Sequence, residues 1–553
     1  MPLGLGPKLL LTSFLFLGLG WLIVAWVDSD SLDTRLRSEL ERYKAIPERR
    51  EASLSTLRGF DPGNQLYQRV GSKNIHSRKR PQTTAVILNW SRFENVRLIS
   101  SLLCGEWLDS VIAEVFIWNN NPQKISRKDF EGTGCPRRKL RIYNSPANEF
   151  FQARFIACTH AYTPYCFIQD DDYLVSSSVI HSLVHRLSLD THGHSIHLLP
   201  SHEHLTTSLR RIRVESTDPG RLSTIHTSPA WLGHGAILHR SEAVEFLQLL
   251  QHLNVSEPER KMADNYYSIL SNQVPEIWFD QGIELGGGQP FTVGSEGDER
   301  NDRHMLRAAE YLTEIVESVS IQNDLKLPYI FLGDRLVRHS TNAVCGGLTC
   351  VLETTIDLLP SGMVHTAPHA RDMLSIGNKN LEVLGLSGQR NYINYPPSFA
   401  VDGNPETYFQ SIGDVKQGEM IMLDFISNVQ VPQQNSLEMA WIVDTRTVQT
   451  LRESTFSFSL DGSKWVGSIG LSFHAWYLED SIQVTAGTEP ICHLLNLEDP
   501  TSHIAEEDIF ECSISLHSRT VQAVRTQFTG SGGAQRGQWK VYEIWLRQKL
   551  LDT

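Results

Sequence analysis

The sequence is short of positive charge. It holds 50 Lys and Arg residues against 63 Asp and Glu residues, which gives a formal net charge of −13 and a pI near 5.9. Proteins that bind nucleic acids present a basic surface to the phosphate backbone, so this composition argues against a nucleic-acid partner. An anionic substrate must therefore be met by a local site.

Long apolar runs are scarce as well. Only residues 9–27 form an uncharged apolar stretch long enough to cross a bilayer's hydrocarbon core. No clear small-x-small cleavage motif follows it, so we expect an uncleaved signal anchor. Because no second stretch of this kind occurs, we predict a single-pass type II protein of the Golgi or endoplasmic reticulum membrane. Residues 1–8 would be its cytoplasmic tail, and the body after residue 28 would be lumenal.

Residues 28–82 are rich in charge and are interpreted as a stem. Apolar side chains recur in it at helical spacing, at Leu32, Leu36, Leu40 and Tyr43. The pattern is too short to predict a coiled coil, but it could pair with a second copy. A homodimer through the stem is therefore a hypothesis.

Cysteine is also sparse, with eight residues in 553. No second close pair of Cys or His completes four ligands, which argues against a zinc site. A lumenal compartment permits disulfides, for which Cys345 with Cys350 and Cys492 with Cys512 are candidates. Cys158 and Cys166 lie in apolar surroundings and are expected to be buried thiols.

Two Asn-x-Ser sequons occur. Asn254 is a candidate for glycosylation, whereas Asn89 ends an apolar strand and is expected to be inaccessible.

The most informative feature present is an apolar strand at residues 165–169 that runs into three adjacent carboxylates, Asp170, Asp171 and Asp172. Like charges crowded at the end of a buried strand are costly unless a cation neutralises them. A set of oxygen ligands suits Mn²⁺ or Mg²⁺. An acidic surface turn is the alternative interpretation.

The surrounding pattern favours a metal site. Strands and helices alternate from residue 83 onward, with strands expected at 84–89, 115–119, 140–144 and 165–169 and helices at 97–108 and 150–162. Such alternation predicts an α/β layer with a largely parallel sheet. Ligands in these sheets bind beyond the carboxyl ends of the strands, where the acidic triplet lies.

Several segments together resemble one enzyme class. They are TAVILNW, NEFFQARF with Asn148 and Arg154, QDDDYL, WLGHGAILHR and KMADNYYSIL with Asp264. They resemble the GT-A (Rossmann-like) nucleotide-sugar glycosyltransferases, most closely the exostosin-like branch, glycosyltransferase family 64. The resemblance covers roughly residues 83–320, and we place the catalytic domain at 83–325. Ala263 departs from the pattern, since the branch typically has a carboxylate there.

The resemblance implies an activity and roles for residues. The activity is metal-dependent transfer of a hexose or N-acetylhexosamine from a UDP-sugar to a glycan or glycoprotein acceptor, with retention of configuration. Asp172 and Asp170 would bind Mn²⁺ or Mg²⁺, with Asp170 also facing the ribose or the transferred sugar. Asp171 would contact the metal through water or the sugar. On the donor side Asn89 and Asn119 would meet the uracil or ribose, with Asn148 nearby. The remaining expected site residues are Arg154 and Asp264 for catalysis and Gly233 and His234 for the acceptor.

Residues 297–312 carry four cationic or titratable groups, Arg300, Arg303, His304 and Arg307. We expect a polar loop running into a helix, which would fold over the diphosphate with Arg303 and His304 as contacts. The glycine-rich approach at residues 285–290 favours a mobile lid. An ordinary surface loop is the alternative.

Residues 326–375 lack a clear period and are expected to be a linker. Residues 376–548 resemble a discoidin (F5/8 type C)-like module, most clearly in AVDGNPETYFQS, and predict an all-β jelly-roll sandwich. Such a module could bind a glycan or act as a scaffold. The alternative for the whole chain is a noncatalytic glycan-binding membrane protein with an inherited transferase fold.

Overall fold

The chain divides into two compact units, Met1–Ala52 and Ser53–Thr553. The computed structural model describes only part of the second unit, namely residues 80–189, 195–215, 224–280, 282–287, 295–318, 328–332, 340–346, 348–404, 406–459, 482–484, 490–495, 508–516, 519–528 and 538–550. The expected tail, anchor and stem up to residue 79 lie outside these residues. Within the part that is described, no helix is both long enough and apolar enough to span a membrane.

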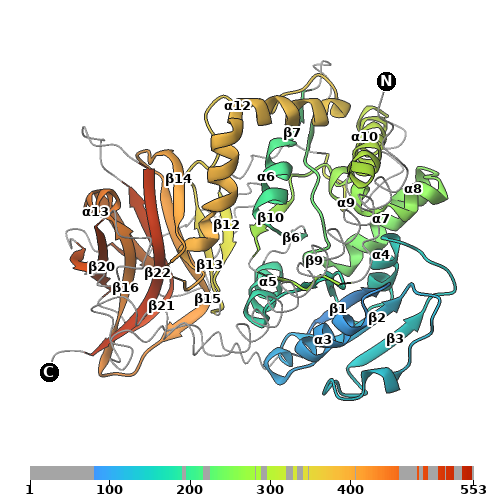
Figure 1. Ribbon diagram of the computed structural model, residues 1–553, viewed down its shortest axis with the longest axis horizontal. Coiled ribbons are helices and arrows are strands. Elements are labelled where there is room, and N and C mark those ends of the chain that lie inside the picture. Colours follow the sequence, from blue (N-terminus) through green and yellow to red (C-terminus); the bar gives the residue numbers. More distant parts are fainter. Residues whose placement is uncertain are drawn as a thin grey trace, which may run out of the picture. The chain divides into compact units, whose positions relative to one another are not determined.

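The first part of the unit is a mixed α/β sheet (Figure 1). Toward one edge of the sheet, β1 (Thr83–Asn89) pairs in parallel with β2 (Ile112–Asn119) and β4 (Tyr165–Gln169), and β2 pairs in parallel with the edge strand β3 (Leu140–Asn144). All seven residues of β1 are buried, as expected for a strand covered on both faces. The four strands predicted here are confirmed.

The parallel order is interrupted once. Strand β9 (Ala236–His239) runs antiparallel to both β4 and β6 (Ile196–Leu199), and β10 (Glu276–Phe279) then pairs in parallel with β6. The start of β9 therefore lies at the same edge as the carboxyl ends of β4, β6 and β10. This edge collects side chains from four strands.

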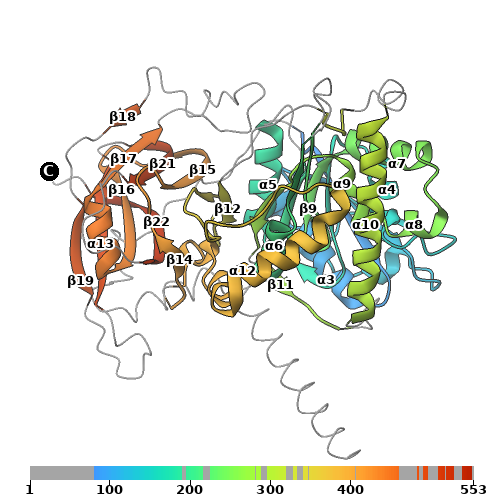
Figure 2. The same cartoon turned by 90° about the horizontal axis from the view of Figure 1, so that it is seen from above.

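Helices cover the faces of this sheet (Figures 1 and 2). They include α3 (Phe93–Leu103), α4 (Gln152–Thr159), α5 (Ser177–Leu189), α6 (Ser201–Leu209), α7 (Arg240–His252), α9 (Asp264–Leu270) and α10 (Ser295–Glu317). The core between α4, α7 and α9 is aromatic, because the ring of Phe155 lies 4.6 Å from that of Phe246 and 5.0 Å from that of Tyr267 between centroids. Such packed rings hold the helices firmly against the sheet.

Two predicted helices have different bounds. The helix expected at 97–108 begins at Phe93 and ends at Leu103, and a short turn, η2 (Glu106–Leu108), follows Gly105. The helix expected at 150–162 begins only at Gln152, because Phe150 has a φ of 50° and so lies outside the helical region.

The sheet continues beyond the α/β part. Strand β12 (Thr341–Val344) pairs in parallel with β10, and β13 (Val351–Thr354) pairs antiparallel with both β12 and β15 (Met420–Gln430). The expected linker at 326–375 thus contains two strands that join the two parts into a single sheet of 13 strands. Each strand of this hairpin has only four residues, too few to show an alternating apolar and polar pattern in the sequence.

The remainder of the unit is antiparallel. Strands β17 (Ser454–Ser459), β18 (Ile482–Val484) and β21 (Thr520–Phe528) extend the large sheet past β15. A second sheet has the order β14 (Phe409–Asp414), β22 (Gln538–Leu550), β16 (Asn435–Asp444), β20 (Ile509–Ser515) and β19 (Ile491–Leu495). Buried residues of both sheets, among them Leu423 and Trp441, share one core. A β-sheet region is confirmed from β14 onward. The prediction of an all-β segment is wrong for residues 376–394, which belong to helix α12 (Met373–Asn394), and the discoidin identity stays a prediction.

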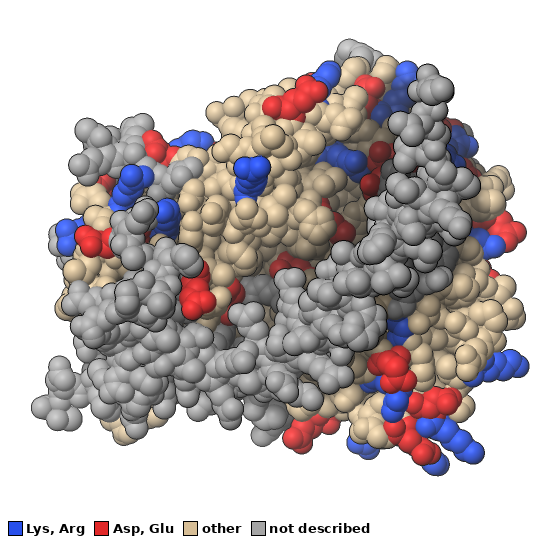
Figure 3. Space-filling view, in the orientation of Figure 1, with Lys and Arg blue, Asp and Glu red and all other residues tan. Residues whose placement is uncertain are grey.

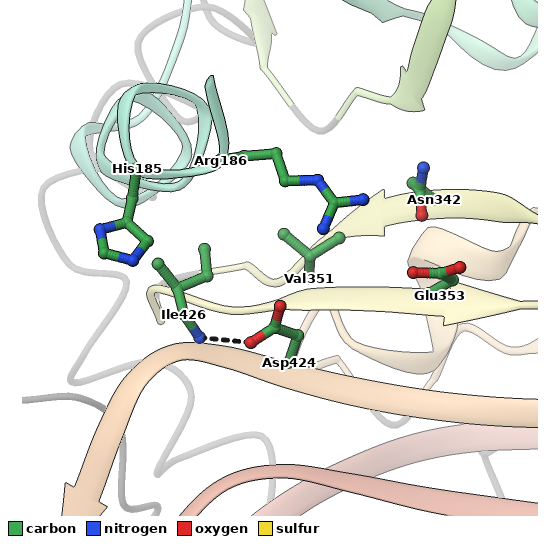
Figure 4. A pocket seen from close by; sticks show the side chains of 7 residues that line it. All are labelled: His185, Arg186, Asn342, Val351, Glu353, Asp424 and Ile426. Carbon is green, nitrogen blue, oxygen red and sulfur yellow. Dashed lines mark hydrogen bonds between the residues drawn. The ribbon is translucent and has the colours of Figure 1, made fainter. Parts of the chain in front are cut away.

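Helix α5 packs on the strands that join the two parts, and polar groups line this contact (Figure 4). Asp424 of β15 accepts a hydrogen bond of 2.8 Å from the Ile426 amide, and His185 and Arg186 project from α5 toward the strands. Burial raises the pKa of Asp424 to about 6 and lowers that of His185 to about 4. The cavity between them, about 10 Å³, has room for about one water.

All eight cysteines form disulfides, in the pairs Cys104–Cys135, Cys158–Cys166, Cys345–Cys350 and Cys492–Cys512. The two candidate pairs are therefore confirmed. The prediction of free thiols at Cys158 and Cys166 is wrong: both are fully buried, but α4 and β4 bring their Cα atoms to 5.8 Å, which is within bridging distance.

Candidate active site

The acidic triplet lies at the carboxyl end of β4, beside a cavity of about 200 Å³. Six of the residues expected at the site line this cavity: Arg154, Asp170, Asp172, Gly233, His234 and Asp264. They come from α4, the end of β4, the turn before β9 and the start of α9. The structure therefore brings together segments separated by about one hundred residues.

Two arginines neutralise the triplet. Arg154 bonds Asp170 at 2.5 Å, and Arg92 lies 3.0 Å from Asp171 and 3.2 Å from Asp172. Burial, followed by the charge of Asp170, raises the pKa of Asp172 to about 6 and raises that of Asp171. The crowding of charge inferred from the sequence is present, but Arg92 was not among the predicted residues.

Arg154 connects Asp170 with Asp264. Its side chain is 2% exposed, and it forms ion pairs with both carboxylates. Its guanidinium also lies 5.0 Å from the centroid of the Phe151 ring. Since a guanidinium offers several donors in a fixed plane, one arginine can orient both carboxylates.

Gly233 is needed where it stands. Its carbonyl accepts a hydrogen bond of 2.9 Å from the Asp170 amide, and a Cβ at this position would lie 2.7 Å from Asp170 Oδ2. The absence of a side chain therefore lets the turn approach the acidic triplet.

His234 pairs with Glu203, a residue at the start of α6 that was not predicted. Its Nε2 lies 3.2 Å from Glu203 Oε1, and the Tyr173 ring meets it edge-on at 4.5 Å. Burial opposes the charge of His234, but Glu203 together with Asp280 and Asp170 outweighs it and raises the pKa to about 9. The imidazole is therefore a cation at neutral pH.

Three asparagines expected on the donor side do not line the cavity. Asn89 and Asn119 are buried, and Asn89 Nδ2 donates to Asn119 Oδ1 over 2.6 Å. Asn119 donates in turn to Asn144 over 2.8 Å, which ties the ends of β1, β2 and β3 together. Asn148 accepts a hydrogen bond of 2.9 Å from the Phe150 amide. In this structure their amides organise the backbone at the sheet edge.

The segment 297–312 is helical within α10, so the prediction of a polar loop is wrong there. Met305, Ala308, Ala309 and Leu312 are buried at helical spacing, a signal that the many charges obscured. Arg303 is exposed, and His304 bonds the Tyr266 hydroxyl at 2.8 Å. Of this segment it is Arg300 and Asn301 that line the cavity.

The start of the glycine-rich approach is bound to the triplet. The Leu285 amide donates to the Asp172 carbonyl over 2.7 Å, and Arg92 Nε donates to the Gly287 carbonyl over 2.5 Å. Asn95 donates to the Gly286 carbonyl over 2.8 Å. Residues 288–290 lie outside the described part, so the lid stays a prediction.

The carboxylates fit a hard divalent cation. Asp170 and Asp172 both line the cavity, and the Asp172 side chain is 40% exposed. In the described part of the chain no group of three His, Cys, Asp or Glu side chains is arranged as a complete metal centre. Oxygens of a bound diphosphate or of water would therefore have to complete the coordination, as is usual for Mg²⁺.

No protein-family model matches this sequence, and no characterised protein matches it in sequence. Solved structures do align. A mannosyltransferase from Pyrobaculum calidifontis with GDP-mannose and Mn²⁺ is 10% identical, with 50% of this chain and 76% of that chain covered and a TM-score of 0.29. Glucosyl-3-phosphoglycerate synthase from Mycobacterium tuberculosis with Mn²⁺ and UDP is 10% identical, with 43% and 81% covered and a TM-score of 0.27. TarS from S. aureus with UDP is 11% identical, with 44% and 76% covered and a TM-score of 0.24. Similarity this low adds nothing to the argument, which rests on the site.

Proposed function

We propose that this chain is a metal-dependent glycosyltransferase that moves a hexose or N-acetylhexosamine from a UDP-sugar to a glycan or glycoprotein. The observation that carries the proposal is the joint presence of Asp170, Asp172 and Asp264 around one cavity, with Arg154 bonded to two of them. Departure of a dianionic diphosphate is the difficult step of such a transfer, and cations beside it stabilise the developing charge.

Asp172 and Asp170 would hold Mn²⁺ or Mg²⁺, which neutralises the leaving diphosphate when bound. In this structure Arg92 forms an ion pair with Asp172, and it would turn toward the phosphate oxygens of a bound donor. Arg300 of α10 is a second cation at the cavity. Arg154 keeps Asp264 oriented beside Asp170, because one guanidinium bonds both carboxylates. Asp264 would then position the acceptor hydroxyl or take up its proton.

We also propose that the transfer retains the anomeric configuration, because the exostosin-like resemblance implies retention. Asp264 could serve either outcome, so the residues alone do not select one. The anomeric configuration of the first product formed, read by NMR before it equilibrates, decides the question.

We extend the proposal to the compartment. Four disulfides favour an oxidising lumen, and residues 9–27 would anchor a type II protein of the Golgi or endoplasmic reticulum, with the stem as a dimer contact. Asn254 is exposed while Asn89 is 2% exposed. When the protein is expressed in a secretory cell, the Asn254→Gln variant should lack one glycan and the Asn89→Gln variant should lack none. The change in gel mobility that endoglycosidase treatment causes in each variant measures this. A lack of any glycan would contradict lumenal exposure of the body.

The proposal is tested by binding before turnover. Mn²⁺ with UDP should raise the melting temperature of the soluble protein, and nucleotide should be released from one member of a panel of UDP- and GDP-sugars. Asp172→Asn should remove both effects, whereas Asp414→Asn, an exposed aspartate of β14, should keep them.

One observation favours a noncatalytic glycan-binding protein instead. All three carboxylates of the triplet are already paired with arginines, an arrangement that would also stabilise a site without metal. The absence of a shift with metal and nucleotide together, combined with binding of free glycan, would select this alternative.

A further inference from the structure

Four residues that line the cavity, together called the wall, each have a buried polar atom that lacks a hydrogen-bond partner among the described residues. The atoms are Glu203 Oε2, His234 Nδ1, Asp264 Oδ1 and Asn265 Oδ1. Asp264 and Asn265 are 6% and 3% exposed, so bulk water does not satisfy them freely. Buried polar atoms without partners are costly, which indicates a ligand that bonds to them.

Three of these four atoms are acceptors. A carboxylate or amide oxygen needs a donor, and the hydroxyl groups of a sugar ring supply several donors from one compact molecule. The indole of Trp231 and the ring of Phe151 also line the cavity and offer apolar surface for the C–H faces of such a ring. The wall therefore matches a polyhydroxylated ring in its hydrogen bonding, and the neighbouring aromatic residues supply apolar surface.

The charges of the wall itself oppose an anion. Glu203 and Asp264 are carboxylates and Glu284 lines the same cavity, whereas Asp170 and Asp172 belong to the proposed metal site and are not counted. Arg154 is shared by two carboxylates and His234 is paired with Glu203. A ring that carried its own carboxylate would meet carboxylate oxygens at the wall, a like-charge contact that disfavours binding.

We propose that the wall formed by Glu203, His234, Asp264 and Asn265 binds an uncharged, hydroxyl-rich sugar ring and rejects a ring that bears a carboxylate or sulfate. This inference rests on the proposed function. It deepens that function, since a uronic acid would be excluded as whichever substrate binds at the wall. The ring could be the transferred sugar or the acceptor's terminal sugar, which share this chemistry.

Matched substrates separate the two sources. In the donor arm, UDP-glucose is compared with UDP-glucuronate, and UDP-galactose with UDP-galacturonate. In the acceptor arm, methyl glucosides and galactosides are compared with the corresponding uronides. The acceptor arm uses the best donor of the panel. We expect a preference in kcat/KM of about 100-fold for the neutral member in one arm, which assigns the wall to that substrate. Comparable use of neutral and anionic members in both arms overturns the proposal.

Binding is measured as well, so that loss of the enzyme function and loss of this inference are distinguishable. Saturation-transfer NMR with methyl glucoside and methyl glucuronide reports ring binding even if no sugar is transferred. A signal from the glucoside alone supports the wall without turnover. Equal signals from both, or none from either in a protein that transfers no sugar, overturn the inference.

A charge-removing variant localises the effect. Glu203→Gln keeps the shape and removes one carboxylate, so the neutral-to-anionic ratio in kcat/KM should fall at least about 10-fold. Glu382→Gln, an exposed glutamate of α12 (Met373–Asn394), is the matched control and should leave the ratio unchanged. Glu284→Gln, at an exposed residue of the cavity, gives a second reading if Glu203→Gln does not fold. An unchanged ratio in every folded cavity variant contradicts the assignment.

Discussion

A glycine decides how closely the turn before β9 approaches the acidic triplet. In Gly233→Ala the new Cβ would lie 2.7 Å from Asp170 Oδ2, so either the turn or the carboxylate must move. We expect the melting-temperature shift with Mn²⁺ and UDP to shrink at least by half and the protein to lose about 1–3 kcal/mol of stability. Gly413→Ala is the matched control, because nothing lies within 4 Å of its added Cβ. Equal behaviour of the two variants would contradict the close approach.

The buried guanidinium of Arg154 should be indispensable to the fold as well as to the site. Arg154→Met would leave Asp170 and Asp264 without their shared cation, and breaking a buried ion pair from one side costs about 3–5 kcal/mol. Arg97→Met removes an exposed pair with Glu94 and should cost well under 1 kcal/mol. The free energy of unfolding in urea checks both. A loss in Arg154→Met as small as that in Arg97→Met would show that the network contributes little.

The site was predictable where its residues lie in one local segment. The triplet directly follows a strand, and Arg154 and Asp264 each stand in a segment that the resemblance covers. Arg92 and Asp171 are 79 positions apart in the sequence, and Glu203 and His234 are 31 apart, so no local motif predicts either pair. Asn89 and Asn119 were placed at the correct edge, but a strand end does not reveal whether its amide turns to the ligand or to a neighbouring strand.

At the scale of elements, buried strands were the most predictable feature. The strands at 140–144 and 165–169 have the predicted bounds: 165–169 is a mostly buried run that ends at Gln169, and 140–144 ends at Asn144. Helix ends were less predictable. Phe150 has a φ of 50°, and its amide and carbonyl bond the side chains of Asn148 and Asn120, which lie outside the apolar pattern of the helix. Strands β12 and β13 have four residues each, and they are defined by partners distant in sequence.

The contact between α5 and β15 makes stability depend on pH through Asp424. Burial raises its folded pKa from 3.8 to about 6, so the folded state favours the protonated form. Stability from this group is therefore full below pH 3.8 and is lost as the pH rises through 6, by at most about 3 kcal/mol. Asp424→Asn keeps an acceptor for the Ile426 amide and cannot ionise.

Asp424→Asn should therefore melt above the parent protein at pH 7.5, and the difference should disappear near pH 4. Asp414→Asn, an exposed replacement of the same kind, should show no such trend. A difference that stays constant between the two pH values would mean that Asp424 does not titrate in this range.

At the scale of the described unit, charged side chains are dispersed over the surface, whereas the α/β part and the antiparallel part share one apolar core. On the face seen in Figure 3, acidic and basic side chains are intermixed, without a continuous basic patch among the residues drawn in colour. One apolar core includes Phe279 of β10, Leu352 of β13 and Trp441 of β16, which come from both parts of the unit. The α/β part and the antiparallel part are thus joined by a backbone ladder and by common packing.

This joint predicts that the two parts unfold together. Leu352 is fully buried on β13, so Leu352→Ala should cost about 2–5 kcal/mol. If the unit is cooperative, hydrogen exchange followed by mass spectrometry will accelerate equally in peptides covering β6 and β10 and in those covering β16 and β20. Ile491→Ala, at a position 57% exposed on β19, should leave both sets unchanged. Acceleration confined to the antiparallel part would mean that the ladder through β12 and β13 does not couple the two, and that the α/β part could carry the site alone.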